Sequence, residues 1–213
     1  MPDVSCGVPD PDNRSLPIRT GETMKHPSSR DYFDYWNECR GHRRAPDRTA
    51  FKPDSLRHFL PDSFVLAAAA SAKSYPVRVA GTRICSRFCR DIFGENFLHL
   101  FVPASRRELG GMLAAIAEES VAVVAGVTAT SPALTAHGFE LLLLPFASRG
   151  YLPGAMTGLL SPFTTTTSPL RDFTLTSWRH LDLPEAPGLR PIEPRTLQKR
   201  MPVPGWTIYE GKS

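Results

Sequence analysis

The apolar run Phe139-Glu140-Leu141-Leu142-Leu143-Leu144 constrains the fold of this chain more than any other segment. Successive side chains of a strand point to opposite faces of a sheet, so the leucines after Glu140 are apolar on both faces. A strand of this kind needs cover on both sides. We therefore predict that residues 139–148 form a central strand of a sheet.

Four other segments have the pattern of strands. Residues 63–70 and 75–80 come early in the chain, and residues 121–130 and 155–163 lie on either side of the apolar run. The alanines that end the first segment weaken its pattern, because alanine disfavours strands. Together with the central strand, these segments predict a five-stranded antiparallel sheet.

One long helix is predicted between the second and third strands. Ser105 and Glu108 have the spacing of a capping box at its start. An apolar stripe follows at helical spacing and consists of Leu109, Met112, Leu113 and Ile116. Gly110 and Gly111 lie inside this helix, where each costs about 1 kcal/mol relative to alanine. They either allow close approach to a neighbour or are a tolerated weakness.

Residues 82–100 have the pattern of short helical turns, interrupted at Gly94 and Asn96. The order of elements is thus two strands, a helical connector, one long helix and three strands. Five antiparallel strands with helices packed on one face form an α+β layer arrangement. We therefore predict an α+β fold, to which an amphipathic helix is added on the N-terminal side.

This N-terminal helix is predicted over residues 28–41. Ser28 can cap its start with Asp31 three residues later, and Gly41 stands where the helix would end. Its apolar face is mostly aromatic and consists of Tyr32, Phe33, Trp36 and Cys39. This face must pack either on its own domain or on a second copy of the chain.

The 21 prolines are concentrated at the two ends of the chain. Proline resists helices and central strands, so both ends are predicted to be tails. We expect a disordered N-terminal tail over residues 1–27, N-terminal helices over 28–61, a folded core over 62–165 and a proline-rich C-terminal extension over 166–213. The extension is expected to contain one short helical or extended piece near residues 175–183.

The net charge of +4 is mild, and its densest part is residues 40–44, with Arg40, Arg43 and Arg44. Basic side chains supply the nonspecific attraction to nucleic acids, so weak nucleic-acid binding through Arg40–Arg44 is one alternative function. The other reading is a solvated helix end, where the helix dipole favours cations.

The chain is predicted to be cytoplasmic. No stretch reaches the roughly 18 apolar residues of a membrane span, and the N-terminus lacks the apolar core of a secretory signal. The four cysteines have no CxxC spacing and form no dense framework, which favours free thiols in a reducing compartment.

No catalytic signature is present in the sequence, neither GxSxG, P-loop, GxGxxG nor HExxH. We therefore predict a protein that is not an enzyme and has no catalytic residues; an unrecognised active site is the alternative. Cys85, Cys89 and His99 suggest a metal, but zinc prefers four ligands and no fourth is evident. Buried structural thiols are the preferred reading of Cys85 and Cys89, and no metal site is predicted.

Five segments carry a family resemblance: residues 32–36 (YFDYW), 45–53 (APDRTAFKP), 75–83 (YPVRVAGTR), 94–97 (GENF) and 140–145 (ELLLLP). In this order they resemble the PAS domain family, and within it the stand-alone PAS proteins common in alphaproteobacteria, typified by motility regulators. The likeness runs from about residue 32 to residue 162 and identifies residues 62–165 as a PAS core.

The resemblance implies a small-ligand pocket between the sheet and the helical connector, or contacts with other proteins. The predicted ligand-binding residues are Arg83, Phe93, Asn96, Phe97, Phe101, Met112 and Ile116. Arg83 would bind an anion or form a salt bridge. Asn96 would contact a ligand or make an Asx-turn, and the apolar residues would wall a pocket or simply form core.

Two further details follow from the resemblance. Arg78 matches an arginine of the family, and in Val77-Arg78-Val79 alternation predicts both valines on one face. The ligand itself stays unknown, with flavin and haem disfavoured: residues 87–92 (RFCRDI) lack the rest of the flavin motif, and residues 105–120 contain no histidine.

The leading functional hypothesis is therefore a signalling protein that senses a small ligand, binds partner proteins in trans, or does both. A ligand-free adaptor whose core is filled by its own side chains is the first alternative. The residues predicted to contact a partner are Tyr32, Phe33 and Trp36. A homodimer is expected as well, because PAS modules commonly dimerise through a helix that precedes the core.

Overall fold

The computed structural model describes residues 23–68, 74–147, 154–166, 168–181 and 183, and the backbone of residues 198–203 and 206–210. The chain divides into two compact units, Met1–Leu183 and Pro184–Ser213. The second unit contains an antiparallel hairpin of β7 (Gln198–Val203) and β8 (Trp206–Glu210), within the predicted C-terminal extension. Most of the predicted tail over residues 1–27 lies outside the described residues.

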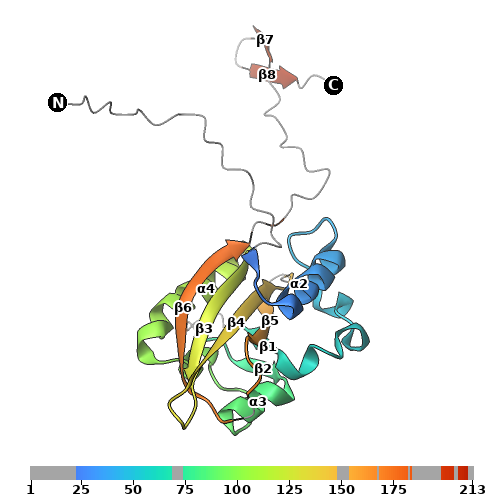
Figure 1. Cartoon of the computed structure of the whole chain (residues 1–213). Helices are drawn as coiled ribbons and strands as arrows, with labels where there is room; N and C mark the ends of the chain where they lie inside the picture. Colours follow the sequence, from blue (N-terminus) through green and yellow to red (C-terminus); the bar gives the residue numbers. More distant parts are fainter. Residues whose placement is uncertain are drawn as a thin grey trace, which may run out of the picture. The chain divides into compact units, whose positions relative to one another are not determined.

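The first unit is built on a six-stranded antiparallel sheet with the strand order β2-β1-β5-β4-β3-β6 (Figure 1). Its strands are β1 (Ser63–Ala67), β2 (Val77–Ala80), β3 (Ala122–Thr130), β4 (Ala136–Pro145), β5 (Ala155–Pro162) and β6 (Arg171–Leu181). Its described helices are α2 (Pro27–Arg40), α3 (Thr82–Phe88) and α4 (Pro103–Glu119), with the short 3₁₀ helices η1 (Arg48–Ala50), η2 (Pro53–Leu56), η3 (Leu60–Asp62) and η4 (Phe97–Leu100). The predicted α+β fold is confirmed.

The central position predicted for the leucine run is also confirmed, because β4 lies between β5 and β3. Leu141 and Leu143 point into one hydrophobic core, which we call the inner core. Leu142 and Leu144 point into a second core on the opposite face, the outer core. Each of these leucines is fully buried, which is worth about 1.5–3 kcal/mol per side chain.

The inner core lies between the sheet and the helices α3, η4 and α4, and the outer core lies between the sheet and α2 (Figure 1). Tyr32 and Trp36 anchor α2 on this outer face by hydrogen bonds as well as by packing. The Tyr32 hydroxyl lies 2.6 Å from Thr157 Oγ1, and Trp36 Nε1 donates to the carbonyl of Pro145 at 2.9 Å. Burial raises the pKa of Tyr32, so the phenol stays protonated.

The sheet has one strand more than expected, since β6 pairs with β3 along its length. This strand lies beyond residue 165, which is the predicted end of the core. A bulge hides this strand in the sequence: Gly126 pairs with Ser177 and Val127 with Leu175, so Thr176 is an extra residue that breaks the alternation.

The helix starts differ from those predicted. His26 caps α2, and its Nδ1 accepts from the Ser28 N–H at 3.1 Å. The long helix α4 starts at Pro103, so Ser105 lies inside it and the predicted capping box is wrong. Ser105 Oγ instead accepts from the N–H of Leu175 at 3.0 Å, and Glu108 Oε1 accepts from Trp178 Nε1 at 2.6 Å. Both polar side chains therefore hold β6 against the helix.

The two valines of β2 lie on opposite faces, in contrast to the prediction from alternation. A register shift falls between Val65 and Leu66, where Val79 pairs with Val65 and Val77 with Leu66. Arg78 is the additional residue between them and is exposed. Val77 is therefore buried in the inner core, whereas Val79 is exposed.

The first prediction concerns the anchoring of α2. Trp36 is completely buried, so Trp36→Ala is expected to lower the free energy of unfolding by about 3–5 kcal/mol. Trp178→Ala is the matched control, because this indole is 36% exposed. The variant mainly loses the hydrogen bond to Glu108, which should lower the free energy of unfolding by about 1 kcal/mol. Urea unfolding of the two variants measures both values. Equal losses, or no loss for Trp36→Ala, would contradict this position of α2.

The second prediction uses two glycines with opposite surroundings. A Cβ at Gly158 in β5 would clash with the Phe64 ring and lie 2.8 Å from the carbonyl oxygen of Leu142, so Gly158→Ala should destabilise by about 1–3 kcal/mol. Gly111 in α4 has nothing within 4 Å of that position, so it is a tolerated weakness. Gly111→Ala should therefore stabilise by about 0.5–1 kcal/mol. Thermal unfolding should show a lower midpoint temperature for Gly158→Ala and a higher one for Gly111→Ala than for the unchanged chain.

Candidate functional site

Most residues predicted to wall a ligand pocket belong to the inner core. Phe97, Phe101, Met112 and Ile116 are buried between the sheet and the helices. The ring of Phe97 stacks on Phe64 with centroids 4.9 Å apart and lies 5.5 Å from the ring of Phe101. The side chains of this region therefore pack against one another.

The two polar or exposed members of the predicted pocket have other positions. Phe93 is 63% exposed and lies outside the inner core. Asn96 caps η4: its Oδ1 accepts from the N–H of Leu98 at 3.3 Å and from the N–H of Tyr75 at 3.1 Å. Its amide oxygen thus holds a turn and fastens it to the chain before β2, which agrees with the Asx-turn reading.

Arg83 forms a salt bridge rather than facing an interior site. Its Nε donates to Asp62 Oδ2 at 2.8 Å, and the side chain is 56% exposed. This hydrogen bond raises the pKa of Arg83 above its usual value. The other carboxylate oxygen of Asp62 accepts from Arg87 Nη2 at 2.8 Å. Asp62 therefore joins two arginines of α3 to the end of η3.

Arg87 is a residue that the sequence analysis missed. Its side chain is 5% exposed, its guanidinium carbon lies 5.3 Å from the centroid of the Phe139 ring, and Nη1 donates to the carbonyl of Leu160 at 3.4 Å. Burial lowers the pKa of Arg87, and Asp62 opposes this shift. Among the described residues its Nε has no hydrogen-bond partner. Its position three residues after the buried Ile84 is the signal that could have placed it on the inner face of α3.

The aromatic residues predicted to bind a partner pack on the chain's own sheet. Tyr32, Phe33 and Trp36 all belong to the outer core, together with Leu142 and Leu144. Of the two alternatives left open by the sequence, the structure shows packing within the domain. A partner could reach these side chains only by displacing α2 from the sheet.

Two arginines of the basic segment bind the end of α2. Arg40 is buried; its Nε donates to Asn37 Oδ1 at 2.7 Å and its Nη1 to the carbonyl of Arg43 at 3.0 Å. Arg43 Nη2 donates to the carbonyl of Cys39 at 3.3 Å. These contacts match the reading as a helix end, and they leave Arg44 as an exposed member of the segment.

Two further searches cover only the described ranges of the chain. They contain no group of three His, Cys, Asp or Glu side chains that could hold a metal ion. No helix within them is long and apolar enough to cross a membrane. Cys39, Cys85 and Cys89 are free thiols; Cys85 is half-buried and Cys89 is exposed at the end of α3, so the predicted burial of Cys89 is wrong.

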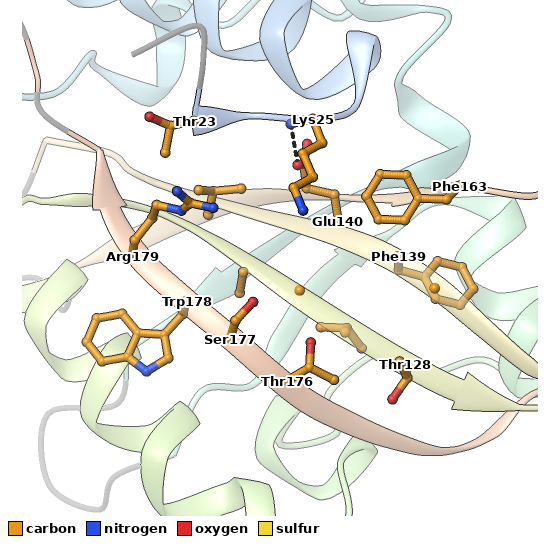
Figure 2. A pocket seen from close by; sticks show the side chains of 15 residues that line it. Thr23, Lys25, Thr128, Phe139, Glu140, Phe163, Thr176, Ser177, Trp178 and Arg179 are labelled. Atoms are coloured by element: carbon orange, nitrogen blue, oxygen red, sulfur yellow. Dashed lines mark hydrogen bonds between the residues drawn. The ribbon is translucent and has the colours of Figure 1, made fainter. Parts of the chain in front are cut away.

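The outer face of the sheet changes character along β3 and β4. Val124 and Leu142 belong to the outer core beneath α2, whereas the next outward positions on the same strands are Gly126 and Glu140. A groove of about 210 Å³ lies on this second part of the face (Figure 2). Its lining is mixed: it includes the polar residues Thr23, Lys25, Thr128, Glu140, Thr176, Ser177 and Arg179 and the apolar residues Val124, Ala125, Val127, Phe139, Phe163 and Trp178, with Gly126 and Gly138.

Glu140 connects this groove to α2. Its side chain is buried, and its two oxygens accept from the backbone N–H groups of Lys25 at 2.7 Å and His26 at 3.0 Å. The polar interruption of the leucine run thus fixes the chain just before α2. The sequence revealed Glu140 only as an exception to the apolar pattern.

A second, more open hollow of about 540 Å³ lies between α4 and β6. It is lined by Ala104, Arg107, Glu108, Gly111, Met112 and Trp178. Met112 is thus the one predicted pocket residue that borders either of these two hollows. Glu108 and Trp178, which share a hydrogen bond, both line this second hollow.

The architecture is that of a small α+β domain, in which helices cover one face of an antiparallel sheet and an added helix covers part of the other. A family model described as PAS domain matches residues 24–161, more than half of the chain. The chain therefore belongs to the PAS domain family, which implies a general sensory or signalling role. A search of curated proteins gave no match.

The third prediction compares the two arginines that share Asp62. Arg87→Ala removes a buried partner and should cost about 1.5–3 kcal/mol of unfolding free energy, because the buried hydrogen bond to the Asp62 carboxylate is lost while Arg83 still pairs with that carboxylate. Arg83→Ala removes an exposed partner and should cost less than about 1 kcal/mol. Urea unfolding at neutral pH measures both. Similar losses for the two variants would refute a structural role specific to Arg87.

Proposed function

We propose that this protein is a non-enzymatic signalling protein of the stand-alone PAS type, which acts in the cytoplasm by binding partner proteins in trans. Within this proposal its inner core is filled by its own side chains, so the ligand-free adaptor is preferred over the small-molecule sensor. The stand-alone alphaproteobacterial type, typified by motility regulators, is part of the proposal and rests on the five segments that carry the resemblance.

The observation that carries the proposal is the packing of the predicted ligand pocket. Phe97, Phe101 and Ile116 are buried in contact with the rest of the inner core, and they border neither of the two hollows described above. Ligand pockets of drug-sized molecules typically measure about 300–1,000 Å³ and are mostly apolar. The outer-face groove is smaller than this range, and the second hollow, at about 540 Å³, is more open, so these surfaces suit contact with a protein segment better than enclosure of a small molecule.

Signalling by such a protein would depend on which surface a partner recognises. The aromatic stripe of α2 does not offer that surface, since Trp36 and Tyr32 are buried against the sheet. The homodimer expected from the resemblance would therefore have to use other residues. The outer-face groove lies beside the start of α2, so a partner bound there would contact the segment that Glu140 holds.

The fourth prediction tests this function by native mass spectrometry of the full chain, purified gently from the cells that produce it. We expect larger complexes that contain at least one other protein and release the chain with the mass calculated from its sequence. The mass of the denatured chain is the control. A stoichiometric excess mass on the released chain would favour the sensor and contradict a self-filled core. A spectrum with only this chain would contradict stable partner binding.

A further inference from the structure

The outer-face groove combines features that point to a particular kind of partner. Lys25 and Arg179 are exposed at its rim, one from the segment before α2 and one from β6 (Figure 2). Within the described part of the chain, neither side chain has an ion-pair or hydrogen-bond partner. We propose that this groove binds an acidic segment of a partner protein, in an extended conformation along β3. This inference rests on the proposed function and names the site and the chemistry of its partner.

The charge balance of the groove favours an anion. Glu140 is its one acidic lining residue, and both of its carboxylate oxygens already accept backbone N–H groups. Two cations therefore face one carboxylate whose hydrogen-bonding capacity is largely occupied. A carboxylate of a partner would receive charge-assisted hydrogen bonds from Arg179 and Lys25, which are about twice as strong as neutral ones.

The bulge in β6 adds neutral donors to the same place. The hydroxyls of Thr176 and Ser177 both lie over Gly126, at 2.7 Å and 2.9 Å from the position that a Cβ of this glycine would occupy. In a regular strand two successive side chains point to opposite faces, but the bulge turns this pair to one face. The hydroxyls thus stand beside Arg179, which is two residues further along β6.

The floor of the groove contains two glycines that lie diagonally across the pair β3 and β4, where Gly126 faces Glu140 and Thr128 faces Gly138. The hydroxyls of Thr176 and Ser177 lie over Gly126, and the ring of Phe163 lies over Gly138. A ligand chain would therefore contact these side chains between β6 and the segment before α2. A groove bounded by two chain segments suits an extended peptide more than a globular surface.

The groove also has an apolar wall on the side of the segment before α2, where the Phe163 ring lies 6.1 Å from the ring of His26. The ring of Phe163 is 48% exposed and lies 3.4 Å from the position of a Cβ at Gly138. An acidic side chain at Arg179 and an aromatic side chain at Phe163 would fill both parts of the lining. The second hollow is a weaker site for an acidic segment, because its own Glu108 lies in the lining beside Arg107.

The test is a titration of the ¹⁵N-labelled full chain with the peptide Gly-Glu-Glu-Phe-Gly, blocked at both ends, followed through backbone amide resonances. We expect shifts of the Gly126 and Gly138 amides, with Gly111 in the second hollow as the unshifted control. The peptide Gly-Gln-Gln-Phe-Gly should bind at least about tenfold more weakly, since it lacks the charge. Raising the salt concentration should weaken binding of the acidic peptide.

A matched pair of variants localises the effect. Arg179→Gln should weaken the acidic peptide about tenfold or more. Arg171→Gln removes an exposed arginine from the same strand outside the groove and should change nothing. No shift of Gly126 and Gly138 up to about 10 mM peptide, corresponding to only a few kcal/mol of binding, would overturn the inference. Equal losses in the two variants, or shifts centred on Gly111, would do so as well.

Glutarate serves as a probe for a small-anion site instead of a docking groove. If glutarate binds as tightly as the acidic peptide, the partner segment is wrong. Purified Arg179→Gln that keeps its protein complexes would overturn this groove and leave the proposed function standing. Wild-type protein that forms no such complexes would contradict the proposed function, whereas the peptide titration still decides on the groove by itself.

Discussion

The two-sided burial of β4 is the constraint on which the rest of the first unit depends. Leu141 and Leu143 require cover on one face, and α3, η4 and α4 provide it. Leu142 and Leu144 require cover on the other face, and α2 provides it. The amphipathic helix before the core is therefore part of the domain, because without it two fully buried leucines would be exposed to water.

The same strand sets where that cover ends. At Glu140 the apolar pattern on the outer face stops, and the carboxylate binds the backbone just before α2. Beyond this point, glycine and threonine replace branched apolar residues on β3 and β4. One buried carboxylate thus marks the boundary between the half of the face that α2 covers and the half that holds the groove.

The sequence predicted the parts of the fold that depend on local pattern. The stripe of α4 and the aromatic face of α2 have helical periodicity and each packs as one face, whereas the leucine run is apolar at successive positions and packs on both faces of the sheet. It did not predict what depends on contacts far apart in the chain. Ser105 and Glu108 have the spacing of a cap but bind β6, about 70 residues away. Bulges at Arg78 and Thr176 break the alternation on which strand prediction relies.

For the site, the sequence pointed to residue types whose roles only the tertiary structure distinguishes. An arginine in α3 was expected to matter, but Arg83 is the exposed partner of Asp62 and Arg87 the buried one. Four of the predicted pocket residues, Phe97, Phe101, Met112 and Ile116, come from the helical connector and α4, and their side chains pack together as core. The groove could not be predicted, because its two cations belong to segments more than 150 residues apart and meet only when β6 joins the sheet. A substitution in the segment before α2 or in β6 would therefore alter this groove.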